Sequence, residues 1–176
     1  TISQKFLGQF AVEKPGPVIF YSGEEPRWHL QQRLWKLARG MNRMSPSSRP
    51  LDAPLFKHPL WVIDQTQRIR LDTAGDRNKL KMAIRLYKPS IVICDPLVHL
   101  HNTDENDARA MATDLLEPLS EVVGSTNTTV AICHHISKGE AEGGVRMRGT
   151  TALWGWYDAG LHAQPVSSNE GEAIVK

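Results

Sequence analysis

The chain has 176 residues, of which 40% are hydrophobic and 23% charged, and its formal net charge is +2. This length suits one domain with a substantial core and is short for two. The small net charge excludes a molecule-wide electrostatic field as the means of attracting nucleic acid or a membrane, so any such binding must come from a local patch.

The cysteines and the lack of long apolar runs indicate the cellular compartment of the protein. Cys94 and Cys133 lie in apolar runs, which predicts buried free thiols in a reducing compartment. No run approaches the ~20 apolar residues of a membrane span, and residues 1–30 show no signal-peptide pattern. We therefore expect a cytoplasmic protein with no membrane partner. Thr1 is not a start methionine and residues 174–176 resemble an interrupted strand, so we expect one domain over residues 1–176, truncated at both ends.

Short apolar runs alternate with amphipathic patterns, which predicts an α/β domain with a mostly parallel sheet. Residues 17–22 predict a buried strand, and Pro26 suits the first position of the following helix. One face of that helix is expected to pack on the sheet through Leu30, Leu34, Leu37, Ala38 and Met41. Four prolines make residues 45–59 a loop, and residues 60–64 predict a second strand.

The same alternation continues to the end of the chain. Asp76 is expected to cap a helix that Pro89 stops, and residues 91–95 predict a central strand. A helix from about Asp107 carries a long apolar stripe, which Pro118 should kink. Further strands are predicted at residues 129–133 and 159–163, with a short helix near residues 150–154 between them.

Acidic and imidazole side chains follow the ends of several predicted strands. Ligands of a parallel sheet bind beyond the carboxyl ends of its strands. The groups at these ends are Glu24 and Glu25, Asp64, Asp95, and His134 with His135. They are candidates for one shared site, although Asp64 lacks supporting context downstream and is interpreted as structural.

Five segments in a fixed order carry a family resemblance. They are residues 16–25, residues 88–97, His101 with residues 104–106, residues 130–139, and residues 148–153. Together they resemble the RecA-like P-loop ATPases related to plasmid RepA-type hexameric helicases. The resemblance implies a RecA-like three-layer α/β sandwich with a mostly parallel central sheet. It also implies ATP and Mg²⁺ as ligands and a homo-oligomer, by resemblance a hexamer.

The resemblance implies roles for the strand-end residues. Asp95 matches the Walker B aspartate that binds Mg²⁺, Glu24 matches the catalytic glutamate, and His135 matches the γ-phosphate sensor. Glu25 and His134 are then further candidates for nucleotide contact.

Each assignment has an alternative from the residues alone. Asp95 could cap a turn, and either glutamate could cap the helix after Pro26, with Glu25 favoured for capping. The two histidines could pack and cap, or bind a metal, although neighbouring strand residues face opposite sides.

Residues 137–149 form a glycine-rich loop directly after His135. In RecA-like motors the corresponding loop contacts single-stranded DNA, which implies nucleic-acid contacts for Lys138, Arg146 and Arg148. Glu140 and Glu142 nearly balance this charge, so an ordinary solvated loop is the alternative. We expect the loop to be mobile.

One element of the family pattern is missing from these 176 residues, namely the Gly-x-x-x-x-Gly-Lys-Ser/Thr loop that holds phosphates. No arginine follows Arg148, so a trans-acting arginine finger is also unassigned. Three functions remain open: a helicase-like ATPase represented by a fragment, a RecA-fold binding module without turnover, and a zinc hydrolase that uses the histidine pair. We expect the 176-residue chain to bind ATP weakly or not at all.

Overall fold

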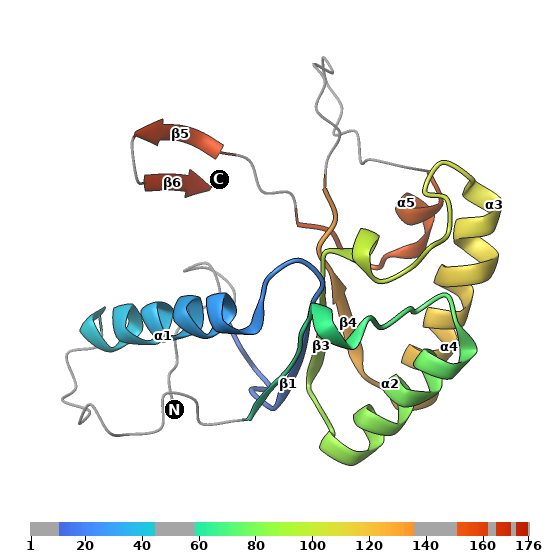
Figure 1. The fold of residues 1–176 in the computed structure, drawn as a ribbon, viewed down its shortest axis with the longest axis horizontal. Helices are drawn as coiled ribbons and strands as arrows, with labels where there is room; N and C mark the ends of the chain where they lie inside the picture. The colour runs from blue at the N-terminus through green and yellow to red at the C-terminus, as the bar shows by residue number, and fades with distance from the viewer. Residues whose placement is uncertain (1–10, 45–58, 136–150, 162–164, 170–171, 176) are drawn as a thin grey trace.

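The computed structural model describes residues 11–44, 59–135, 151–161, 165–169 and 172–175 (Figure 1). Its centre is a sheet of four parallel strands in the order β2–β1–β3–β4. The strands are β1 (Val18–Ser22), β2 (Leu60–Ile63), β3 (Ile91–Asp95) and β4 (Thr129–Ile132). The predicted α/β fold with a parallel sheet is therefore confirmed, and all four carboxyl ends lie at one edge.

Helices lie on both faces of the sheet, as in a RecA-like fold (Figure 1). One face carries α2 (Ala74–Tyr87), α3 (Ala108–Ala110), α4 (Glu117–Thr126) and α5 (Ala152–Trp156). The main core lies between these helices and the sheet, where Val92, Leu80 and Leu119 are fully buried. No helix in the described part of the chain is long and apolar enough to cross a bilayer.

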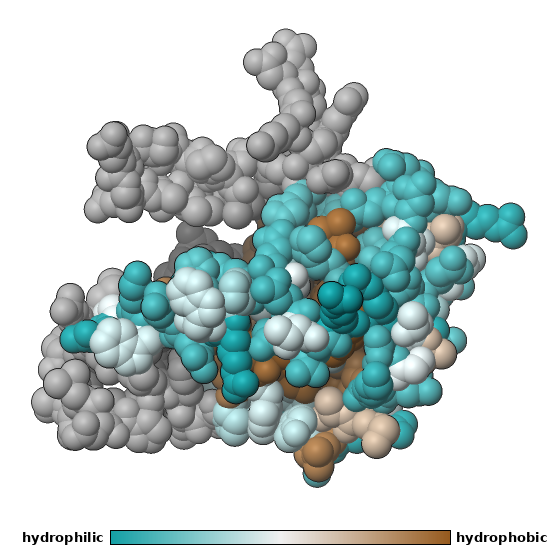
Figure 2. All heavy atoms as spheres, in the orientation of Figure 1, coloured by the Kyte–Doolittle hydropathy of each residue, from teal (hydrophilic) through white to brown (hydrophobic). Residues whose placement is uncertain are grey.

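The opposite face is covered only in part, by α1 (Arg27–Met44). Leu30 is buried there and Leu34 is half-buried, but Leu37 is 62% exposed, so the predicted packing stripe on α1 is wrong at Leu37. The side chains of Ala38 and Met41 lie outside the described residues. The helix extends away from the sheet in Figure 1, which accounts for the exposure of Leu37. The face of the molecule that is turned toward the viewer in Figure 2 is largely hydrophilic, with apolar residues visible in its middle and at its lower edge.

A π-helical turn joins α3 to α4. Residues Met111–Leu116 form this turn, in which the amide of Glu117 bonds the carbonyl five residues back, at Ala112. Pro118, which the sequence predicts to kink the helix, lies directly after the turn at the start of α4. Because proline lacks an amide hydrogen, its best place is where the regular ladder is already interrupted.

Three further expectations are corrected. The N-cap of α2 is Thr73, whose hydroxyl accepts a bond from the amide of Asp76, so Asp76 lies in the first turn instead of capping it. Cys133 lies one residue beyond β4 and is exposed, whereas Cys94 is buried as predicted. Residues 159–161 are not a strand; instead β5 (Pro165–Asn169) and β6 (Glu172–Val175) form an antiparallel pair.

Candidate functional site

The carboxyl ends of β1 and β3 lie side by side and place two candidate residues together. Ser22 is paired with Asp95 in the parallel register, and the amide of Gly23 donates to the carbonyl oxygen of Asp95 over 2.7 Å. Glu24 follows immediately, so its side chain and that of Asp95 line one cavity of about 310 Å³. The two carboxylates therefore share a cavity between the sheet edge and α1.

The end of β4 joins the same edge through main-chain bonds. The amide of Cys133 donates to the carbonyl of Cys94 over 2.8 Å, and the amide of Leu97 donates to the carbonyl of Cys133 over 2.9 Å. These bonds tie the residue after β4 to the turn after β3, and they fix where His134 and His135 leave the sheet.

Glu24 lies between two imidazoles. Its Oε1 atom is 3.6 Å from Nε2 of His135 and 3.3 Å from Nε2 of His99. All three side chains are about half exposed, so solvent reaches them. Glu24 and His135 are thus brought together, whereas His99 was missed by the sequence reasoning. The only indication of His99 in the sequence is its position in the short turn Leu97–His99, soon after Asp95. The direction of the side chains in that turn could not be predicted from the residues.

Glu25 contacts α1 and not His99 or His135. Its carboxylate bonds the guanidinium of Arg33 and lies 3.8 Å from Nδ1 of His29. The expectation that Glu25 caps the helix is wrong, because the amides of His29 and Leu30 bond the carbonyl of Pro26 and the carboxylate is committed to Arg33. Glu25 still lines the cavity that contains Asp95.

The side chain of Asp95 contacts the thiol of Cys133. Although Cys133 as a residue is exposed, desolvation of its thiol raises its pKa to about 11, and the charge of Asp95 and a hydrogen bond to it add to this effect. The thiol therefore stays protonated at neutral pH and contacts the carboxylate as a neutral group.

The histidine pair after β4 divides between two neighbourhoods. His135 faces Glu24, whereas His134 lies close enough to buried His101 to contribute to the lowered pKa of that imidazole, whose main cause is desolvation. No group of three or more His, Cys, Asp or Glu side chains within the described ranges could hold a metal ion. The oxygen of Asp95 suits Mg²⁺, which commonly takes one protein carboxylate and completes its shell with water and phosphate oxygens.

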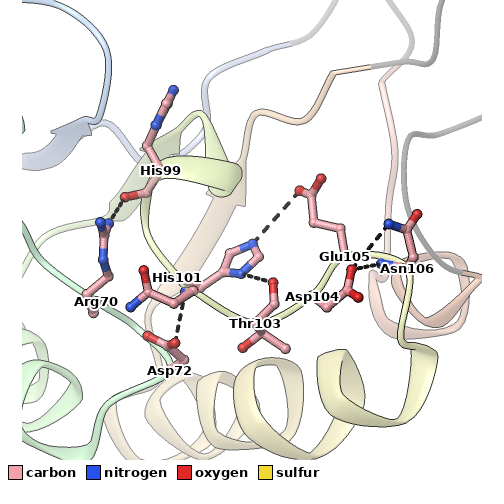
Figure 3. A network of polar contacts seen from close by, with 9 residues as sticks. Arg70, Asp72, His99, His101, Thr103, Asp104, Glu105 and Asn106 are labelled. Atoms are coloured by element: carbon pink, nitrogen blue, oxygen red, sulfur yellow. Dashed lines mark hydrogen bonds and ion pairs between the residues drawn. The ribbon is translucent and has the colours of Figure 1, made fainter.

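The loop after β3 is bound firmly to the loop after β2 (Figure 3). Arg70 donates to the carbonyl of His99, and the amide of Asn102 donates to Asp72 over 2.9 Å. The buried His101 ring lies 3.1 Å from the carbonyl of Thr103 through Nδ1 and 3.9 Å from Glu105 through Nε2. These contacts hold the segment that positions His99.

Two other groups of predicted residues are placed as follows. Asp64 caps the short turn Gln65–Gln67, and hydrogen bonds from Thr66 lower the pKa of its carboxyl group, as the structural interpretation predicts. Lys138, Arg146 and Arg148, with the rest of loop 137–149, lie outside the described residues.

A parallel α/β sheet binds its ligands at the carboxyl edge, where this chain carries acidic and imidazole groups. Comparison with known protein families matches residues 3–141 to the AAA domain. Because the match covers more than half of the chain, the protein belongs to the AAA domain family, and it is a P-loop NTPase-like domain of the nucleotide-binding type. A search of curated proteins finds no match.

Proposed function

We propose that the intact protein hydrolyses ATP at the carboxyl edge of its sheet, with Glu24 as the base that activates water. The observation that carries this proposal is the placement of Glu24, which shares a cavity with Asp95 and lies between the imidazoles of His99 and His135. A carboxylate held in this way can orient a water molecule and accept its proton.

Other residues of the site support this reaction in different ways. Asp95 would hold Mg²⁺, which when bound neutralises charge on phosphate oxygens. His135, three residues beyond β4 and 3.6 Å from Glu24, would hydrogen-bond a terminal phosphate and bind Glu24 when that phosphate is gone. Glu25 lines the cavity, and His134 follows β4 beside His135; both are assigned nucleotide contacts in the same proposal.

We further propose that hydrolysis drives movement along, or unwinding of, DNA in a homo-oligomer, by resemblance a hexamer, in the cytoplasm. Lys138, Arg146 and Arg148 would contact single-stranded DNA in this scheme. The support is the glycine-rich composition of residues 137–149, which include these three basic residues, and their place in the sequence soon after β4.

A second candidate is a nucleotide-independent RecA-fold binding module that has no catalytic turnover. The observation that favours it is the absence of a Gly-x-x-x-x-Gly-Lys-Ser/Thr sequence from the 176 residues. Titration of this chain with Mg-ATP tests the point. The expected result is no tight site, and micromolar binding would mean that another segment holds the phosphates.

The catalytic assignment is tested by Glu24→Gln in the intact protein, with phosphate release and nucleotide binding measured separately. Hydrolysis should fall by at least about 100-fold while nucleotide affinity stays within about threefold, because the carboxylate acts on water and not on the ground-state phosphates. Asp95→Asn should weaken the Mg²⁺-dependent part of binding.

The matched control is Glu121→Gln, which removes a charge from an exposed position of α4. It should leave both hydrolysis and binding unchanged. Loss of turnover in Glu25→Gln with normal turnover in Glu24→Gln would reverse the assignment of the two glutamates.

A further inference from the structure

A second cavity, of about 550 Å³, lies at the carboxyl ends of β1 and β2. It shares only Ser22 with the cavity that contains Asp95. Its walls come from the end of β1, from residues 63–70 after β2, and from His99 and Leu100. A volume of this size is typical of sites for small ligands. No role in the proposed hydrolysis has been assigned to it.

The charge lining this second cavity is mainly positive. Arg68 and Arg70 both line it, and Asp64 is the single carboxylate among its lining residues. Asp64 is already engaged, since it accepts a bond from the amide of Thr66 over 2.9 Å and another from the Thr66 hydroxyl. Asp64 keeps its charge, so the lining carries two guanidinium groups against one carboxylate.

The two arginines differ in what binds them. Arg70 donates to the carbonyl of His99, so part of its guanidinium is already hydrogen-bonded within the protein. Arg68 ends the Gln65–Gln67 turn in a left-handed conformation, with φ of 44° and its amide bonded to the carbonyl of Gln65. Its guanidinium makes no hydrogen bond or ion pair with any residue in the described part of the chain. Arg68 therefore lines the cavity with a guanidinium that has no partner among the described residues.

We propose that this cavity is a binding site for a phosphate group, separate from the nucleotide site. A guanidinium offers a planar set of donors that matches two oxygens of a phosphate. Gln65 and Thr66 supply uncharged polar groups beside it. The phosphate could belong to the backbone of a single-stranded nucleic acid or to a small phosphorylated molecule, and the chemistry of recognition is the same.

His99 connects this cavity to the proposed catalytic site. His99 lines the cavity, and its Nε2 atom lies 3.3 Å from Oε1 of Glu24. A phosphate bound in the cavity would therefore lie close to the residue that contacts Glu24 and would change how Glu24 is held. This connection rests on the proposed function, whereas phosphate binding itself does not.

The binding experiment uses the full chain without ATP. Inorganic pyrophosphate is titrated by calorimetry, and a fluorescein-labelled oligothymidylate is titrated by anisotropy at low salt. Arg68→Ala should weaken binding of at least one probe about tenfold, as expected for the loss of a charge-assisted bond. Arg70→Ala is avoided because it would also release the His99 carbonyl.

Arg85→Ala is the matched control, because Arg85 is exposed on α2, outside the lining of the cavity. Dependence on Arg68 for the oligonucleotide alone identifies a nucleic-acid backbone, and dependence for pyrophosphate identifies a small phosphate ligand. The proposal is overturned if neither probe binds, or if Arg68→Ala and Arg85→Ala weaken binding equally. Glu24→Gln should retain pyrophosphate binding. The hydrolysis proposal can therefore fail while the phosphate-site proposal holds, and the two outcomes are distinguishable.

Discussion

Gly23 has a steric role that a single methyl group can test. A Cβ atom added at Gly23 would lie 2.6 Å from Cβ of His99 and 3.6 Å from the carbonyl oxygen of Asp95. Carbon atoms in contact normally lie about 3.5–4.0 Å apart, so His99 must retreat by roughly 1 Å. The His99 main chain is bound at both ends, by its amide to Pro96 and by its carbonyl to Arg70, which opposes this retreat.

Gly23→Ala should therefore lower the free energy of unfolding by about 1–3 kcal/mol, the usual cost of overpacking. The assay is urea unfolding followed by far-ultraviolet circular dichroism. Gly75→Ala is the matched control, because a Cβ at Gly75 in the first turn of α2 would meet nothing within 4 Å. It should raise stability by up to about 1 kcal/mol, since alanine favours the helix. The reasoning is refuted if Gly23→Ala unfolds at the urea concentration of the wild type, or if both variants shift in the same direction.

Two further predictions concern the core and the buried imidazole. Leu119→Ala, at a position with 0% exposure, should cost about 2–5 kcal/mol in urea unfolding, whereas Leu86→Ala, at 71% exposure, should be near neutral. Burial lowers the pKa of His101 below its usual 6.5, despite the opposing charges of Glu105 and Asp72. As pH falls through about 6.5, the unfolded chain binds a proton that the folded protein does not, so stability decreases. His101→Gln should flatten this decrease between pH 7.5 and 5.5, and an unchanged slope would contradict the assignment.

Much of the sheet could be predicted because its strands are short apolar runs that end in recognisable polar residues. Strands 18–22, 60–63, 91–95 and 129–132 all fall within the predicted runs. The failures arise where tertiary geometry decides. The apolar stripe on α1 looks like a packing face, but the helix leaves the sheet before Leu37 can reach it. Strand pairing between residues 165–169 and 172–175 depends on a local antiparallel register that the alternation of strands and helices does not predict.

The candidate site shows the same division. The adjacency of Glu24 and Asp95 follows from the pairing of neighbouring parallel strands, and this could be anticipated from the family pattern. His99 could not, because its approach to Glu24 depends on a turn that is fixed by Arg70 from another loop. Similarly, Glu25 was expected to cap a helix because it directly precedes Pro26. The sequence does not show that Arg33, eight residues later, binds its carboxylate.

The outer position of β4 determines where a further strand could extend the sheet. One side of β4 pairs with β3, and its other side has no strand partner in the described part of the chain. A parallel strand added there would bring its own carboxyl end beside His134 and His135. The peptide donors of a loop that follows such a strand would then face Asp95 and Glu24 across the end of β4. A strand in that position would extend the sheet and bring its following loop to the candidate site at the same time.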